Sequence, residues 1–181
     1  MSRIGNSPLT LPSGVTVTEE GRAVLVKGPK GEVRLHKPGG VKLTQEDGTL
    51  TVERLSNSKP DRAAHGTMRR LVGNAVAGVT EPYKRTLDIV GVGYQASLKG
   101  RQLVLKVGFA NEITVDIPDD VQCEVPSTTR VTFTSCNKES VGAIAARTRK
   151  VRPPEPYNGK GIRYEGERIE RKAGKSFASG G

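Results

Sequence analysis

The first half of the chain alternates apolar and polar residues over short runs. Four such runs have the length of a strand and are separated by Gly and Pro, at residues 15–18, 23–27, 31–35 and 49–53. Alternation with a period of two places the apolar side chains on one face of a strand. The four runs therefore predict a small antiparallel sheet.

After these runs the apolar spacing changes to three and four residues. Between Ala64 and Val79 this spacing favours an amphipathic helix. Ser58 at the N-cap, Pro60 in the first turn and Asp61 at the positive end of the helix dipole indicate that the helix begins near Ser58. Arginine and glycine occupy the opposite side, at Arg62, Gly66, Arg69, Arg70 and Gly73. A solvated helix face is the simplest interpretation of that side.

The same order of elements returns in the second half of the chain. Strand-like runs at residues 102–107, 112–117 and 131–134 precede a second, shorter helical pattern that begins near Asn137. The apolar stripe of this pattern consists of Val141, Ile144, Ala145 and Val151. A second domain similar to the first is the expected result.

When the first half is shifted by 80 residues, residues of several types coincide with identical residues of the second half. The shift lays Gly28 on Gly108, Pro38 on Pro118 and Val41 on Val121. Such self-similarity indicates an internal duplication.

The expected architecture is α+β, with two tandem similar domains from internal duplication. Each is a small, mostly antiparallel sheet packed on one helix, and a basic irregular C-terminal extension follows. The strand-like run that starts at Arg85 comes directly after the first helix, which places the boundary near Pro82. We expect an N-terminal domain at residues 1–82, a C-terminal domain at 83–152 and the extension at 153–181.

Positive charge is concentrated at the C-terminal end. The net charge of +10 favours a polyanionic partner, with nucleic acid ahead of an anionic membrane. Residues 1–82 carry a net charge of +4 and residues 83–139 are neutral, whereas residues 140–181 carry ten basic and four acidic groups. More than half of the net charge therefore lies in the last segment.

The extension lacks the pattern of a helix or a strand. Residues 152–157 contain three prolines, and residues 158–161 have no apolar periodicity. A disordered charged tail is one interpretation; an irregular RNA-binding surface is the other, because tyrosine and glycine are interleaved with spaced cations. The extension carries few apolar side chains, so we expect truncation after Val151 to leave both domains stable.

Other function classes find little support. Residues 91–93 lack the third glycine of a dinucleotide-binding turn, and residues 28–31 lack the ending of a P-loop and are typical of a hairpin turn. His36 and His65 have no acidic or nucleophilic partner at a recognisable spacing. Neither helical pattern has the aromatic residues of a membrane-surface helix. We expect no enzyme activity, cofactor, metal, membrane or small-molecule substrate.

The cysteines and the apolar runs indicate a cytoplasmic protein. Cys123 and Cys136 have no CxxC spacing, which favours reduced structural thiols over a disulfide or a metal site. No run approaches the roughly 18 apolar residues of a membrane span, and the start of the chain lacks the apolar core of a secretory signal.

Residues 154–164, Pro-Glu-Pro-Tyr-Asn-Gly-Lys-Gly-Ile-Arg-Tyr, resemble the signature of the family of ribosomal protein six of the large subunit, in its bacterial form. Residues 1–5, 26–31 and 89–94 resemble the family as well, so the resemblance covers nearly the whole chain. It implies two related α+β domains, in agreement with the repeat. It also implies a position near the base of the factor-binding stalk, where the C-terminal domain binds large-subunit ribosomal RNA close to the loop that stimulates translational GTPases. Neighbouring ribosomal proteins and translational GTPases would then lie nearby, and the role would be in subunit assembly and translation.

The resemblance implies RNA contacts at cations and tyrosines of the last segment. These residues are Arg147, Arg149, Lys150, Arg152, Tyr157, Lys160, Arg163, Tyr164, Lys172 and Lys175. The chain departs from the family at Asn158, where a basic residue is common, and in residues 176–181, which lack extra lysines. At the amino end Asn6 replaces a usual lysine, close to a further candidate contact, Arg3.

Overall fold

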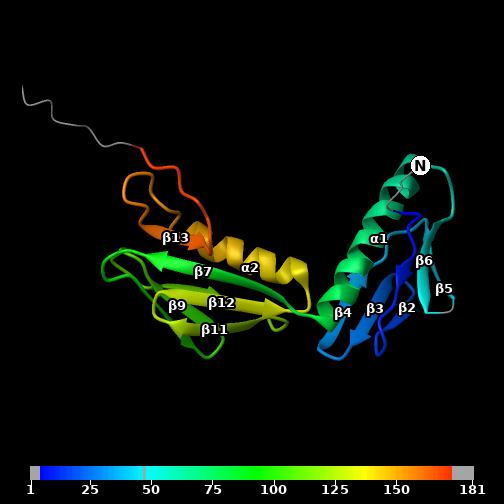
Figure 1. The fold of residues 1–181 in the computed structure, drawn as a ribbon, viewed down its shortest axis with the longest axis horizontal. Coiled ribbons are helices and arrows are strands. Elements are labelled where there is room, and N and C mark those ends of the chain that lie inside the picture. Colours follow the sequence, from blue (N-terminus) through cyan, green and yellow to red (C-terminus); the bar gives the residue numbers. More distant parts are fainter. Residues whose placement is uncertain (1–4, 47, 173–181) are drawn as a thin grey trace, which may run out of the picture. The chain divides into compact units, whose positions relative to one another are not determined.

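The computed structural model describes residues 5–46 and 48–172, and these form an α+β structure with two helices (Figure 1). Its two structural units are Met1–Tyr83 with Cys136–Lys138, and Lys84–Ser135 with Glu139–Gly181. The predicted α+β class is therefore confirmed. The short segment Cys136–Lys138, which belongs to the first unit, comes from a part of the sequence that gives no sign of this grouping.

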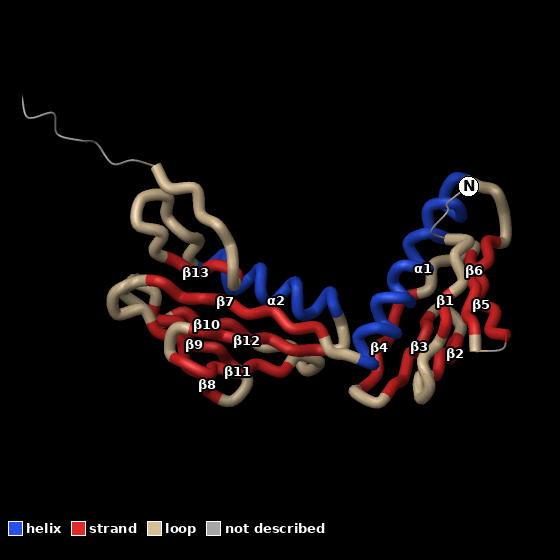
Figure 2. The backbone as a smooth tube through the Cα atoms, viewed as in Figure 1, coloured by secondary structure: helices blue, strands red, loops and turns tan. Residues whose placement is uncertain are grey.

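The first unit contains two three-stranded sheets and one helix. The strand orders are β2-β3-β4 and β1-β6-β5, and each adjacent pair is antiparallel. The elements are β1 (Leu9–Thr10), β2 (Thr16–Glu20), β3 (Ala23–Gly28), β4 (Gly31–His36), β5 (Val41–Glu46), β6 (Thr49–Arg54) and α1 (Lys59–Thr80). Helix α1 packs against strands of both sheets, as Figure 2 shows.

Local sequence accounts for these elements. Val24 and Val26 alternate with more exposed residues on β3 and are buried. On α1 the fully buried apolar positions are Met68, Val72 and Val79. The side chain of Ser58 accepts a hydrogen bond from the backbone N–H of Asp61, which confirms the predicted N-cap. The hairpin turn predicted at residues 28–31 is also confirmed, because it joins the paired strands β3 and β4.

The second unit contains a three-stranded sheet, a four-stranded sheet and one helix. The strand orders are β10-β9-β8 and β11-β12-β7-β13. The elements are β7 (Tyr83–Val90), β8 (Gln95–Lys99), β9 (Gln102–Lys106), β10 (Ile113–Asp116), β11 (Gln122–Ser127), β12 (Arg130–Ser135), α2 (Lys138–Val151) and β13 (Gly161–Tyr164). Figure 1 shows α2 lying along the sheet that contains β7 and β12.

The two units repeat the same topology. The order β2-β3-β4 corresponds to β8-β9-β10, and the order β1-β6-β5 corresponds to β7-β12-β11. In each unit the helix follows the last of these strands along the chain. The predicted duplication is thus visible strand by strand, with β13 added at the free edge of β7.

Strand β13 makes the C-terminal extension part of the fold. It pairs antiparallel with β7, with Ile162 opposite Ile89, and the side chain of Ile162 is fully buried. Truncation after Val151 would therefore remove an edge strand and a core residue. The reason for expecting little change in stability was wrong, because the few apolar residues of the extension include one in the core.

The buried stripe of α2 also differs from the prediction at one position. Val141, Ile144 and Ala145 are buried as expected, but Thr148 completes the stripe in place of Val151. The hydroxyl of Thr148 donates a hydrogen bond to the Ile144 carbonyl at 2.9 Å. That bond satisfies the hydroxyl, and a polar residue can therefore occupy a core position that an apolar pattern overlooks.

Candidate nucleic-acid interface

The cations of α2 point to different sides of the helix. Arg147 and Lys150 are three residues apart and exposed, whereas Arg149 is two residues from Arg147 and half-buried. A separation of two residues turns a side chain by about 200° on a helix. Arg147 lines a hollow with Pro118 and Ile144, and Arg149 faces the segment after β13. The helix therefore directs two cations that are close in the sequence into different surroundings.

The proline-rich segment after α2 is a closed loop held by backbone hydrogen bonds. The N–H of Glu155 donates to the Lys160 carbonyl at 2.9 Å, and the N–H of Ile162 donates to the Arg152 carbonyl at 2.7 Å. Tyr157, 55% exposed, lies within this loop, and Lys160 is exposed as well. Two predicted contact residues are thus presented to solvent on a loop whose shape the backbone determines.

Gly161 lets this loop pack against the start of β13. A Cβ at this position would lie 2.7 Å from both the Pro153 carbonyl oxygen and the Pro154 Cα atom, and the φ angle is 144°. Both the contact and the angle exclude an ordinary side chain. The last glycine of the Gly-Lys-Gly part of the signature is therefore required because two backbone segments approach closely there.

The chain beyond β13 returns to the proline-rich loop. Lys172, exposed, donates its backbone N–H to the Pro156 carbonyl at 2.9 Å. Arg163 is half-buried on β13. The structure therefore brings Tyr157, Lys160 and Lys172 onto the same pair of loops. Lys175 and residues 176–181 lie outside the described residues, as does Arg3.

Arg149 forms a bidentate ion pair with Glu167. Its Nε and Nη2 atoms donate to Oε2 and Oε1 of Glu167 at 3.0 and 2.5 Å, and the guanidinium lies 5.7 Å from the ring centroid of Tyr164. The hydrogen bond from Arg149 lowers the pKa of Glu167 below its usual value, and Glu167 in turn raises the pKa of Arg149. Both groups are therefore charged at neutral pH.

This pair predicts an acid-sensitive contribution to stability. Because the folded pKa of Glu167 lies below the unfolded value of 4.5, the pair stabilises the fold above that pH and loses this effect as pH falls through the folded pKa. We expect Glu167→Gln to remove part of the loss of thermal stability that wild type shows below pH 4.5. Calorimetry across this pH range measures the change in thermal stability. Glu112→Gln is the control and should have a smaller effect, because Glu112 forms an exposed ion pair with Lys106. An acid dependence in Glu167→Gln equal to that of wild type would contradict the prediction.

Arg152 lies against an aromatic ring from another loop. Its guanidinium carbon is 5.0 Å from the ring centroid of Phe109, within the range of a cation–π contact. Phe109 is itself exposed and follows β9. This contact orients Arg152 through the face of its guanidinium, and the N–H donors at the edge of that group can still bind a ligand.

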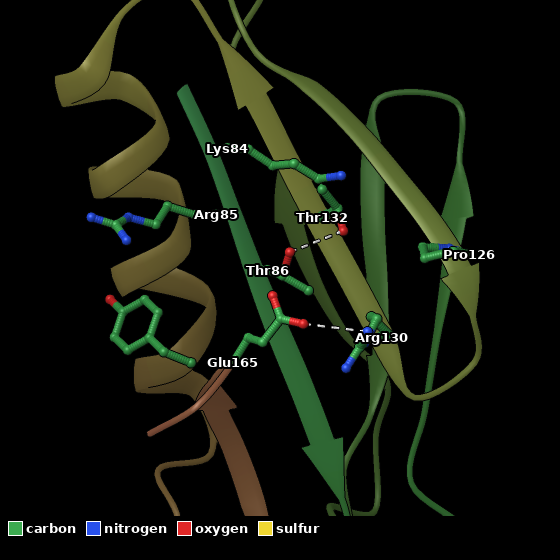
Figure 3. A pocket seen from close by; sticks show the side chains of 8 residues that line it. Lys84, Arg85, Thr86, Pro126, Arg130, Thr132 and Glu165 are labelled. Carbon is green, nitrogen blue, oxygen red and sulfur yellow. Dashed lines mark hydrogen bonds and ion pairs between the residues drawn. The ribbon is translucent and has the colours of Figure 1, made fainter. Parts of the chain in front are cut away.

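Further cations line a pocket to which Tyr164, at the end of β13, also contributes. Figure 3 shows Lys84 and Arg85 extending to opposite sides of the strand that carries both. Lys84, Arg85 and Arg130 line it, and among the described residues Glu165 is its one acidic side chain. Arg130 is paired with Glu165 at 3.4 Å and with Asp88 at 3.0 Å. Sequence reasoning missed Lys84 and Arg85 because residues 83–139 are neutral as a whole. Their adjacency in the sequence is the one signal that could have identified them.

A metal site, a membrane-spanning helix or a reactive cysteine in the described residues would indicate another kind of function. There, no group of three His, Cys, Asp or Glu side chains could hold a metal ion. No helix among the described residues is long and apolar enough to cross a membrane. Cys123 and Cys136 are free thiols, and burial raises the pKa of Cys123 to about 11, so that this thiol is protonated at neutral pH.

Comparison with known proteins identifies a matching family. The model of the family described as ribosomal protein L6 matches residues 11–82 and again residues 90–165. The two matches correspond to the two repeats of the fold.

Individual relatives match over almost their full length. The chain is 49% identical to large ribosomal subunit protein uL6 of Rubrobacter xylanophilus and 50% identical to that of Halalkalibacterium halodurans, in each case over 97% of this chain and 99% of the relative. It is 48% identical to the protein of the same name from Moorella thermoacetica, over 100% of this chain and 99% of the relative.

Proposed function

Because the chain belongs to the ribosomal protein L6 family and is a protein of the large ribosomal subunit, we propose that it binds large-subunit ribosomal RNA through the C-terminal part of its second unit. The proposed role is structural: it supports subunit assembly and translation and performs no catalysis. The observation that carries the proposal is the ordered pair of loops that presents Tyr157, Lys160 and Lys172.

The charges of this region support phosphate binding. In the described residues, Lys150, Lys160 and Lys172 have no carboxylate within ion-pair distance, in contrast to Arg149 and Arg130. Unpaired cations gain most from a phosphate, since no ion pair has to be broken. We propose that the RNA surface consists of Lys150, Arg152, Tyr157, Lys160, Arg163, Tyr164 and Lys172, with Lys84 and Arg85 at its edge. Arg147, nearly one helical turn before Lys150 on α2, would extend this surface along the helix.

We expect single substitutions on this surface to reduce the salt dependence of RNA binding. Lys160→Ala or Lys150→Ala should each lower the slope of log K against log salt by roughly 0.7 to 0.9, because one phosphate contact is lost. Filter binding with transcribed large-subunit ribosomal RNA measures this. Lys99→Ala is the control. Lys99 lies on β8, in the three-stranded sheet of the same unit, and its removal takes away the same charge but should leave the slope unchanged. Equal slopes for all variants would remove these lysines from the surface.

The position of this RNA site within the subunit is the finer part of the proposal. The family membership supports a site near the base of the factor-binding stalk, beside the loop that stimulates translational GTPases, with neighbouring ribosomal proteins and bound GTPases nearby. Chemical probing of large-subunit ribosomal RNA should show protection near that loop by wild type and weaker protection by Lys160→Ala. Protection confined to other regions of the RNA would contradict this placement.

A further inference from the structure

We infer that Glu167 is a positioning residue for RNA binding and that Arg149 serves the same purpose instead of contacting phosphate. This inference rests on the proposed RNA-binding function. It assigns a role in RNA affinity to an acidic residue, whose charge by itself opposes binding to a polyanion.

The carboxylate of Glu167 is the point where three hydrogen bonds meet. Two come from the guanidinium of Arg149 on α2, and the third comes from the backbone N–H of Tyr164, at 2.9 Å from Oε2. The backbone N–H of Glu167 donates in turn to the Tyr164 carbonyl at 3.0 Å. The turn after β13 is thus closed on itself and attached to the helix through one side chain.

The Nε–Nη2 edge of Arg149 is already occupied by Glu167. Phosphate recognition by arginine uses two parallel N–H donors, and the Nε and Nη2 donors of Arg149 are bound to Glu167. The side chains of the pair are 31% and 23% exposed, so the contact is only partly screened by solvent. A phosphate would have to break this pair before it could bind Arg149 through its Nε and Nη2 donors.

The chain that this pair anchors carries the proposed contacts. Before the turn, the N–H of Glu165 donates to the Thr86 carbonyl of β7 at 3.1 Å; beyond it, Lys172 is bonded to Pro156 of the loop. Between these two points, the Arg149–Glu167 pair ties the segment to α2, which carries Lys150. Without the pair, the segment that carries Lys172 would lose its fixed position relative to the cations of the helix. RNA binding would then have to restore these positions at a cost in affinity.

Glu170 provides a matched control for the charge of Glu167. It lies three residues further along the same segment and is exposed, and in the part of the chain that the structure describes it has no ion pair. Removal of either carboxylate makes the protein more positive by the same amount. General electrostatics therefore predicts equal or tighter RNA binding for both variants. A positioning role instead predicts weaker RNA binding for the Glu167 variant alone.

The test compares Glu167→Gln, Glu170→Gln, Arg149→Lys and the double variant by filter binding to transcribed large-subunit ribosomal RNA over a range of salt. We expect Glu167→Gln to bind about tenfold more weakly than wild type, with an unchanged salt slope, because the phosphate contacts of the bound complex are the same. Glu170→Gln should bind as tightly as wild type or more tightly. Arg149→Lys should resemble Glu167→Gln, and the double variant should lose no more than either single one, since both act through one contact.

Each outcome separates this inference from the proposed function. If Glu167→Gln binds as tightly as Glu170→Gln, or if Arg149→Lys lowers the salt slope with no change in Glu167→Gln, positioning is overturned while RNA binding stands. If Lys150→Ala and Lys160→Ala leave the affinity and the slope of wild type unchanged, the proposed surface itself fails. Hydrogen exchange provides a second readout that does not depend on RNA. The Tyr164 amide should exchange faster in Glu167→Gln than in Glu170→Gln while the amides of β12 stay protected, and equal rates would overturn the inference.

Discussion

Replacement of Gly78 by alanine is expected to destabilise the first unit by about 3 kcal/mol. Gly78 lies near the end of α1, where a Cβ would be 2.0 Å from the Cys136 carbonyl oxygen and 2.9 Å from the Tyr83 ring. The first of these atoms is backbone and cannot rotate away. The segment Cys136–Lys138 would have to leave the helix, and with it the hydrogen bond from the Cys136 thiol to the Lys30 carbonyl.

This loss of stability is opposite in sign to the change that helix propensity alone predicts. Alanine is favoured over glycine in a helix interior by about 1 kcal/mol. Gly142 in α2 is the matched control, because a Cβ there would meet nothing within 4 Å. We expect Gly142→Ala to stabilise its unit by about 0.5 to 1 kcal/mol. Urea unfolding of both variants measures the difference, and a Gly78→Ala protein as stable as wild type would show that the segment is not held against the helix.

Replacement of Ile162 by alanine should destabilise the second unit by about 2 to 4 kcal/mol. Ile162 is fully buried opposite Ile89 at the edge where β13 pairs with β7. The loss combines the transfer of the side chain to water with the cavity left behind. Truncation after Val151 should cost more than the substitution, since the whole strand and its backbone hydrogen bonds are removed with it.

Val92→Ala is the control for this substitution. Val92 is 92% exposed in the connection between β7 and β8, and its truncation should change stability by no more than about 0.5 kcal/mol. Thermal unfolding followed by circular dichroism compares the two variants. Equal midpoints for Ile162→Ala and Val92→Ala would mean that β13 adds nothing to the stability of the second unit.

The local elements were accessible from the sequence because each depends on neighbours a few residues apart. Periods of two and of three to four residues identified the strands around Val24 and Val26 and the helix that begins after Ser58. Strands β1, β5, β11 and β13 were not among the predicted runs. They are short or lie at sheet edges, where fewer positions are buried and the apolar signal is weaker.

The candidate site was accessible only in part. The family signature and the concentration of charge both led to the region of Tyr157 and Lys160. Neither could show that Arg149 is bound to Glu167, 18 residues away, while Lys150 next to it is free of a carboxylate in the described structure. The sequence presents these two cations as equivalent, and their partners make them different.

By itself, then, the sequence determined the α+β class, the duplication, the family and the segment that carries the charge, because these follow from periodicity, self-similarity and composition. Tertiary structure alone decided that residues 161–164 complete the sheet of the second unit, that Arg149 is bound to Glu167, and that Lys84 and Arg85 line a pocket with Tyr164. The physical reason is that each of these facts depends on residues far apart in the chain. Strand pairing and ion pairing bring them together, and no local pattern records which partner a side chain will meet.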